Sequence, residues 1–460
     1  MERRRIRRGS RSRRPSVRPL TILLASTPIT AHTINLLPVA ARLVERGHRV
    51  LWYAASRFDD RIQAVGAEPL SFCAARELDD SAAAYGGAGT PRSIAGLRQG
   101  FVDHLVGDVG DRVHDLEALT LGVGVDVVLS DAMFVAARLW HERGGPVWAS
   151  VGDGPLTYAD VDTPPYGAGL LPMPGREGRR RNRVTTRIGR ELIWGPAEQR
   201  LGAIRCELEL VQSGRPVLEE ARSPYLHLQC CTPSFEYPRV GLPASVRFVG
   251  SLGTVDWSPG WSEHPSPPWW DAFLADRRPA VLVSQGTLRP DFRELVLPTV
   301  RALLGTGVQI VVTTGSAPVS ALADALGGSL PAGVWAAPWI PYESVLPHVD
   351  AFVTNGGYTG VTLALAHGVP LVQVGSTEEK AEIGARIAWS GVGLRSRWLP
   401  PQRRLRSLVH RVLVDPSIRS AADRMRAESA ALIGTGLTAA DACADLLEDL
   451  AASHEPSARM

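Results

Sequence analysis

Short apolar runs alternate with helical patterns in the first half of the chain. Four such runs, LTILLA, RVLWYA, DVVLS and PVWASV, begin at residues 20, 49, 126 and 146. After the first run, apolar residues recur at helical spacing from Leu36 to Val44, and Gly47 ends this helix just before the second run. Buried strands that alternate with helices are typical of βαβ units in a parallel sheet. We therefore predict a doubly wound α/β domain.

A second series of the same kind begins near residue 279. Its strands are AVLVSQG, VQIVVTTG, VWAAPWI, AFVTNGG and PLVQVGS, each followed by a turn. Residues 255–270 carry four Pro and four Trp and show neither the helical nor the strand periodicity of apolar residues. This indicates a linker whose Trp residues pack on a neighbour. The predicted organisation is therefore an N-terminal domain at 19–254, a linker at 255–278 and a C-terminal domain at 279–460. The last domain should close with a helix that begins with a capping box of Thr438 and Asp441.

Composition and charge exclude several classes of protein. The 460 residues, 45% of them hydrophobic, are enough for two or three ordinary cores. The net charge is only +3, and residues 1–18 hold nine Arg and one Glu, so the rest of the chain is acidic and does not resemble a nucleic-acid-binding body. No apolar run reaches the roughly 18 residues of a membrane span.

Two Arg-rich segments and the cysteines add smaller expectations. The Arg-rich start and the apolar LTILLAST resemble the first parts of a signal peptide, but an amphipathic helix follows, so we predict a disordered arm at 1–18 or a start placed too early. Residues 174–190 are predicted to form a solvated loop or, less often, a contact for an anionic acceptor or a membrane surface. Five irregularly spaced Cys provide no disulfide framework or zinc motif, which favours a reducing cytoplasm.

Residues 351–370 give the sharpest chemical signal. They comprise a buried strand, the Gly-rich turn NGGYTG and a helix that ends at Gly368. Amides around Gly356 and Gly357 at the start of this helix suit an anion such as a pyrophosphate. A tight turn that needs only the dihedral freedom of glycine explains the same sequence equally well.

The context of this turn resembles a known family. The segment WIPYESVLPHVDAFVTNGGYTGVTLALAHGVPLVQVGSTEEK, Trp339 to Lys380, is similar to the nucleotide-sugar motif of family 1 glycosyltransferases of the GT-B fold, closest to bacterial enzymes that glycosylate macrolides and related natural products. His32, Val39 and RGHRV at 46–50 fit the same group, so the resemblance covers nearly the whole chain. It implies two Rossmann-like domains facing each other across a cleft, with no metal and no cofactor beyond the nucleotide sugar.

The resemblance also assigns donor-binding roles in the second domain. Trp339 would stack on the nucleobase, and backbone groups of Ile340 would bond its edge, although a buried core Trp is the plainer alternative. Phosphate-binding roles fall to Asn355 at the head of the turn, where relatives have His, and to Gly356, Gly357, Thr359, Gly360, Ser284 and Thr287.

Three further positions in the motif concern the sugar and the ribose. Glu379 stands where the family has an acidic residue for hexose hydroxyls, and Lys380 where many relatives have Gln. Leu363 stands where relatives place a ribose-binding Glu. Because Leu cannot accept hydrogen bonds, the ribose is held otherwise or the donor is a thymidine diphosphate sugar, and the uridine and thymidine donors remain equal alternatives.

The first domain offers a candidate catalytic pair. His32 follows the first strand in STPITAH, and a base near neutral pKa is what an attacking alcohol or phenol needs. A carboxylate on its other nitrogen would orient the imidazole, and Asp131 ends the strand DVVLSD. Both residues match the family's catalytic base and its partner. Asp160-Val161-Asp162 mimics a metal-binding D-x-D, but its loop context favours no metal site.

The function expected from the sequence is an inverting glycosyltransferase. A hexose would pass from a UDP- or dTDP-sugar to a hydroxyl of a hydrophobic natural product, with no nucleic-acid partner. The alternatives are a non-catalytic sugar-nucleotide-binding partner of the same fold and a sugar-nucleotide epimerase, because fold alone does not confer activity.

Overall fold

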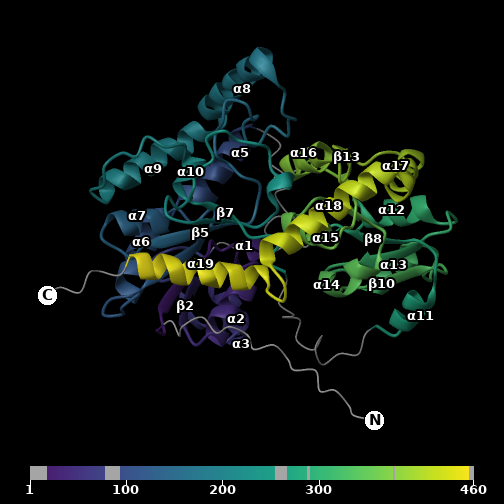
Figure 1. Ribbon diagram of the computed structural model, residues 1–460, viewed down its shortest axis with the longest axis horizontal. Helices are drawn as coiled ribbons and strands as arrows, with labels where there is room; N and C mark the ends of the chain where they lie inside the picture. The colour runs from purple at the N-terminus through teal and green to yellow at the C-terminus, as the bar shows by residue number, and fades with distance from the viewer. Residues whose placement is uncertain (1–17, 78–93, 254–266, 287–290, 377–378, 455–460) are drawn as a thin grey trace, which may run out of the picture.

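The computed structural model describes residues 18–77, 94–253, 267–286, 291–376 and 379–454. In this part of the chain, the strands form two parallel sheets, and helices cover both faces of each sheet (Figure 1). No helix in these ranges is long and apolar enough to cross a membrane.

The first domain is built on a seven-stranded sheet in the order β3-β2-β1-β4-β5-β6-β7, with every pairing parallel. Its strands are β1 (Thr21–Ala25), β2 (Arg49–Ala54), β3 (Glu68–Ser71), β4 (Val127–Asp131), β5 (Trp148–Gly152), β6 (His227–Gln229) and β7 (Val246–Phe248). Its α-helices are α1 (Thr30–Ile34), α2 (Leu37–Glu45), α3 (Asp59–Ala64), α5 (Ile94–Phe101), α6 (Val109–Leu119), α7 (Ala136–Glu142), α8 (Gly175–Gly189), α9 (Gly195–Glu207) and α10 (Val217–Glu220). Short 3₁₀ or π segments are η1 (Ser56–Phe58), η2 (Val102–Val106), η3 (Arg190–Trp194) and η4 (Pro233–Phe235).

The second domain is built on a six-stranded sheet in the order β10-β9-β8-β11-β12-β13, again all parallel. Its strands are β8 (Ala280–Ser284), β9 (Gln309–Thr313), β10 (Val334–Ala337), β11 (Ala351–Thr354), β12 (Leu371–Val374) and β13 (Gly393–Ser396). The helices of this half are α11 (Trp270–Ala275), α12 (Val296–Leu303), α13 (Val319–Ala325), α14 (Tyr342–Val345), η5 (Leu346–His348), α15 (Tyr358–Ala366), α16 (Lys380–Ser390), α17 (Gln402–Val414), α18 (Pro416–Ile433) and α19 (Ala439–Ser453).

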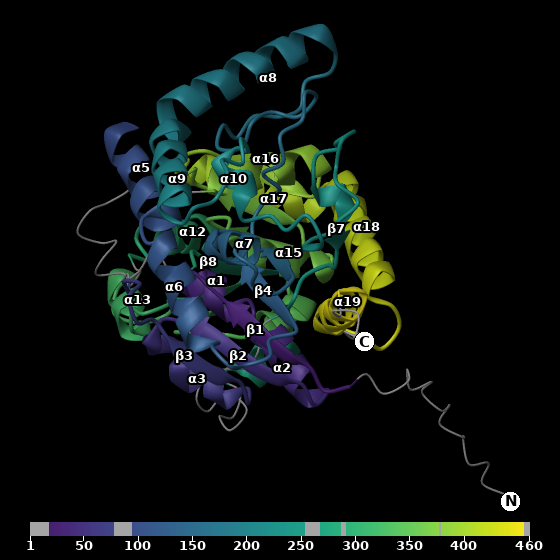
Figure 2. The same ribbon diagram turned by 90° about the vertical axis from the view of Figure 1, so that its left-hand side faces the viewer.

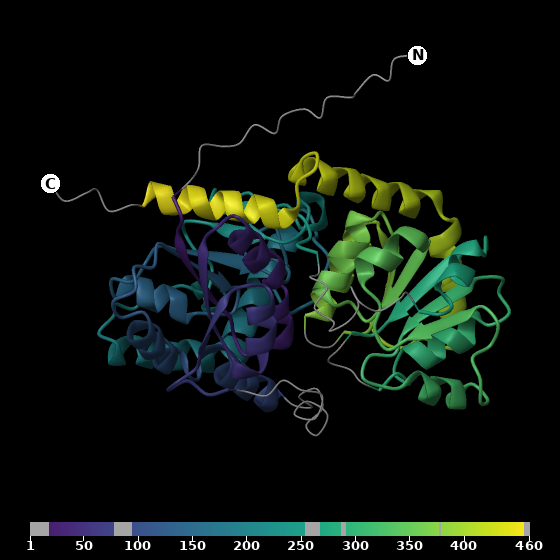
Figure 3. The same cartoon turned by 90° about the horizontal axis from the view of Figure 1, so that it is seen from below.

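The last helix returns to the first domain. The predicted capping box of Thr438 and Asp441 starts α19, which then lies along α2 of the first domain instead of closing the second (Figures 1 and 3). The Nε2 atom of buried His48 lies 3.0 Å from Glu448 Oε1, and Arg46 donates to Asp445 and Glu448 over 2.7 and 2.9 Å. The C-terminal segment therefore ties the two domains together.

The Arg-rich segment is not a loop. Residues 175–189 form α8, which projects from the first domain together with η3 (Figure 2). Arginine is a good helix former, and Asn182 is buried on the inner side of the helix, where its side chain donates to the carbonyl of Val161 over 3.1 Å. The sequence prediction of a solvated loop was wrong because the arginines that suggested a loop are themselves good helix formers.

The predicted N-terminal arm and the predicted linker lie partly outside the described residues. Of the predicted arm at 1–18, only Arg18 is described, and it forms an ion pair with Asp126 over 2.7 Å. Of the Trp-rich linker, Trp269 is described at the start of α11. Its indole N–H donates to the Ala336 carbonyl over 3.0 Å, and its ring stacks on Trp335 in the second domain.

Candidate functional site

The carboxyl ends of three neighbouring strands bring the candidate catalytic residues together. β4 pairs with β1 on one side and with β5 on the other. His32 lies on α1 just after β1, and Asp131 is the last residue of β4. Because parallel strands end at one edge of the sheet, side chains that follow them converge there.

His32 contacts two carboxylates instead of the one expected. Its Nδ1 atom lies 3.2 Å from Asp131 Oδ1 and 2.8 Å from Asp153 Oδ2. Asp153 comes directly after β5, as Asp131 comes at the end of β4, so the rule of converging strand ends could have found it. With Nδ1 facing carboxylates, the imidazole presents Nε2 as its second proton-transfer atom.

The environment of this cluster determines its protonation. Burial lowers the pKa of the His32 imidazole, but the charges of Asp153 and Asp131 outweigh burial and raise this pKa well above its ordinary value. Burial alone would raise the pKa of Asp131, yet His32 and the backbone N–H groups of Thr27 and Met133 lower it. The two carboxylates therefore favour the protonated imidazole, and the base form of His32 appears only as the pH rises through this raised pKa.

The Gly-rich turn lies at the corresponding edge of the second sheet. β11 pairs with β8 and β12, which brings Ser284, the turn after Thr354 and the end of β12 to one edge. Gly356 has φ +98°, and a Cβ there would lie 2.9 Å from Gln373 Cγ, so both dihedral and space require glycine. The buried Gln373 amide donates to the Asn355 and Gly375 carbonyls over 3.0 and 2.8 Å and fixes the turn.

The other predicted donor-binding residues surround this turn. Gly357 precedes the first turn of α15, and Gly360 lies on that helix against the Tyr342 ring, whose hydroxyl donates to Ser284 over 3.1 Å. The Asn355 amide nitrogen donates to the Gln285 carbonyl, while its buried Oδ1 has no partner among the residues that the structure describes. A bound hydrogen-bond donor would satisfy this oxygen.

Five further predicted donor-binding positions differ in where the structure places them. Trp339 is half-buried, and Ile340 is buried with its side chain in the core, so only its backbone is available to a base. Glu379 directly precedes α16, and Lys380 is the first residue of that helix and buried. Thr287 lies outside the described residues.

Leu363 is a core residue of α15. It is only 3% exposed and belongs to the same hydrophobic cluster as Tyr358 and Val361. Leu363 therefore offers no hydrogen bond to a ribose, and the uridine and thymidine donors stay alternatives.

Direct contacts join the two candidate sites across the domains. Thr359 Oγ1 on α15 donates to Asn35 Oδ1 over 2.9 Å, and Asn35 lies three residues after His32. The Gln229 amide donates to the hydroxyl of Tyr358, the first residue of α15, over 2.7 Å. The Gly-rich turn of one domain thus faces the His32 cluster of the other.

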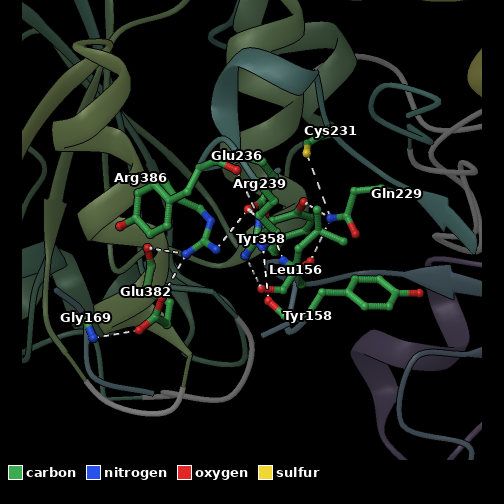
Figure 4. A network of polar contacts seen from close by, with 12 residues as sticks. Leu156, Tyr158, Gly169, Gln229, Cys231, Glu236, Arg239, Tyr358, Glu382 and Arg386 are labelled. Atoms are coloured by element: carbon green, nitrogen blue, oxygen red, sulfur yellow. Dashed lines mark hydrogen bonds and ion pairs between the residues drawn. The ribbon is translucent and has the colours of Figure 1, made fainter. Parts of the chain in front are cut away.

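A buried ionic network holds the loop that follows Asp153 (Figure 4). Arg386 on α16 lies 2.9 Å from both Glu236 and Glu382, and its guanidinium covers the Tyr237 ring. Glu382 accepts the N–H groups of Gly167 and Gly169 over 3.1 and 2.6 Å. Nothing in the sequence pattern predicted this network.

The same network also contacts the beginning of that loop, and the loop itself leads to Glu379, the predicted sugar-binding residue. Glu236 accepts the Leu156 N–H over 2.8 Å, and Arg239 donates to the Leu156 and Tyr158 carbonyls. Burial, and secondarily the charge of Glu379, raise the pKa of the Tyr166 hydroxyl in this loop. One loop of the first domain therefore links the His32 cluster to the predicted sugar-binding residue.

The two aspartates of the D-x-D sequence have structural partners. Asp160 accepts the N–H groups of Asp162 and Val240 over 2.8 and 3.1 Å, and Asp162 forms an ion pair with Arg179 of α8 over 2.7 Å. In the described ranges, no group of three or more His, Cys, Asp or Glu residues could hold a metal ion.

Comparisons with known proteins identify the family. The family model described as Erythromycin biosynthesis protein CIII-like, C-terminal domain, matches residues 308–434. The chain is 38% identical over 426 residues to 4'-demethylrebeccamycin synthase of Lentzea aerocolonigenes, covering 89% of this chain and 96% of that protein. It is 30% identical over 458 residues to UDP-glycosyltransferase 2 of Phaeomoniella chlamydospora, covering 94% and 96%.

Solved structures share the architecture. The crystal structure of glycosyltransferase VinC in complex with DTDP superimposes with a TM-score of 0.66 at 19% identity, covering 94% of this chain and 100% of that chain. The two parallel-sheet domains predicted from the sequence are therefore confirmed as the GT-B fold. The chain belongs to the GT-B glycosyltransferases of natural-product biosynthesis.

Proposed function

We propose that the protein is an inverting, metal-independent glycosyltransferase that moves a hexose from a nucleoside diphosphate sugar to a hydroxyl of a hydrophobic small molecule. One observation carries this proposal: a His32 imidazole held by two carboxylates lies across the domain junction from a Gly-rich helix start, and Asn35 and Thr359 join the two over 2.9 Å. A base opposite an anion-binding helix start is the arrangement that displacement of a diphosphate requires.

The reaction follows from these positions. Nε2 of neutral His32 takes the acceptor proton while the acceptor oxygen forms a bond to the anomeric carbon and the bond from that carbon to the diphosphate oxygen breaks. Asp131 and Asp153 stabilise the resulting imidazolium through Nδ1. Amides at the start of α15 receive the charge that develops on the leaving diphosphate. The attack from the opposite face inverts the anomeric configuration.

The donor is a uridine or thymidine diphosphate sugar. Two similar proteins point to different donors, because one is a UDP-glycosyltransferase and the other was crystallised in complex with DTDP. The buried Leu363 provides no ribose contact that would separate them. The ratio of kcat/KM for the two donors carrying the same sugar decides the question in the unmodified protein.

Activity should persist in EDTA at an unchanged rate. The leaving charge is met by helix-terminal amides in this account, so a divalent ion has no required role. The measurement is release of nucleoside diphosphate and glycoside from a donor with a panel of hydrophobic alcohols and phenols, with EDTA or with Mg²⁺ or Mn²⁺. Strict dependence on added metal would refute the mechanism. Donor binding without turnover would favour a non-catalytic partner, and an epimerised donor would favour an epimerase.

Asp153→Asn should move the pH dependence of kcat/KM to lower pH. The base form of His32 appears only as the pH rises through its raised pKa, and removing one of the two negative neighbours lowers that pKa. We expect the ascending limb of the profile to shift by about one pH unit or more. Asp111→Asn on the exposed side of α6 is the control, with no shift expected. An unshifted profile for Asp153→Asn would remove Asp153 from the site.

A further inference from the structure

α8 and η3 together form a basic projection that the proposed reaction does not use. Residues 175–194 contain seven arginines and two glutamates, whereas the chain as a whole has a net charge of only +3. Arg176, Arg180 and Arg183 are exposed and lie at three- and four-residue intervals, so they form one row along the helix.

A row of aliphatic side chains lies beside these arginines. Val184, Ile188 and Leu192 are 50%, 49% and 49% exposed and follow one another at four-residue intervals. Such spacing places them on one side of the helix. Their exposure leaves a large part of each apolar side chain in water, where it contributes nothing to the core.

The loop beneath α8 adds two more exposed apolar residues. Val161 is 55% and Leu171 40% exposed, and the side chains of Asn182 and Arg181 donate to their carbonyls over 3.1 and 2.9 Å. A third of all large exposed hydrophobic residues in the described chain thus fall between residues 161 and 192. This concentration distinguishes the α8 surface from the scattered apolar residues found on any protein surface.

We propose that α8, η3 and the loop at 161–171 form a docking surface for an anionic lipid bilayer. Arginines attract anionic headgroups, and the adjoining aliphatic row enters the boundary between headgroups and acyl chains. A second copy of the chain is a poorer occupant, because two such helices would bring like charges together. A nucleic acid would engage the arginines but leave the aliphatic row without a partner.

The position of this surface gives docking a consequence for the proposed function. The loop that supports α8 begins beside Asp153 in the His32 cluster and is held by Glu382 at Gly167 and Gly169. Lipid docking would therefore place the candidate acceptor loop near a phase into which hydrophobic molecules partition. This consequence rests on the proposed function, whereas the docking itself does not.

Vesicle flotation of the full chain tests the proposal independently of activity. We expect binding to vesicles of phosphatidylcholine with phosphatidylglycerol, little binding to phosphatidylcholine alone, and release by salt. The triple variant Val184→Ser, Ile188→Ser and Leu192→Ser should lower the partition coefficient at least tenfold. The triple variant Arg176→Gln, Arg180→Gln and Arg183→Gln should lower it at least tenfold as well.

A control of equal charge separates site-specific docking from general attraction. Arg247→Gln, Arg404→Gln and Arg424→Gln remove three exposed arginines from three other elements and should leave the partition coefficient within about twofold. Circular dichroism confirms that each variant is folded. The proposal is overturned by absent binding to the anionic vesicles, by an equal loss in the control, or by a dimer that the aliphatic variant dissociates.

Discussion

His32→Ala should lower kcat by at least a hundredfold while the affinity for the donor remains near that of the unmodified protein. The imidazole acts on the acceptor proton, and general bases of this kind contribute about 10² to 10⁴ in rate. The predicted phosphate contacts lie on the second domain around Gly356 and Gly357, so the loss should not extend to donor binding.

The measurement pairs steady-state kinetics with calorimetric titration of the donor. His114→Ala is a suitable control, because His114 is exposed on α6, and its turnover should be unchanged. Near-normal turnover of His32→Ala would remove the imidazole from the reaction. Equal loss of donor affinity and turnover would instead indicate a structural role at the domain junction.

Arg386→Met should destabilise the protein by about 3–5 kcal/mol. Arg386 is 1% exposed and lies between Glu236 and Glu382, so its removal leaves the buried Glu382 without its cation and Glu236 with Arg239 alone. Breaking a buried ion pair in this way carries such a cost because the remaining charge cannot be solvated. The expected result is a clearly lower midpoint in urea denaturation.

An exposed ion pair provides the matched comparison for this variant. Arg187 and Glu191 on the surface of α8 and η3 lie 2.8 Å apart, with side chains 81% and 61% exposed. Arg187→Met should barely move the urea midpoint, because water solvates the remaining carboxylate. Equal effects of the two substitutions would contradict the view that the Arg386 network fastens the domains together.

The sequence indicated the strands whose side chains are buried on both faces. Runs such as RVLWYA and AVLVS correspond to β2 and β8 because a central parallel strand is apolar throughout. The prediction missed β6, which spans three residues, His227 to Gln229, two of them polar. A short polar strand is visible only through its pairing with β5 and β7.

Site residues were predictable where they end a strand or fill a family motif. His32 and Asp131 have such positions, and the structure brings them within 3.2 Å. Asp153 was missed although it follows β5, because the sequence VGDG is typical of a turn. The Arg386 network could not be predicted, since its directly bonded members lie up to 215 residues apart and meet only when the two domains pack.

The anomeric configuration of the product is the most direct test of the central claim. The protein should convert an α-linked nucleoside diphosphate hexose and a hydrophobic alcohol or phenol into a glycoside, and the coupling constant of the anomeric proton in NMR reports its configuration. We expect a β-glycoside that forms in EDTA and forms at least a hundredfold more slowly with His32→Ala. An α-glycoside would contradict the single in-line displacement assisted by His32.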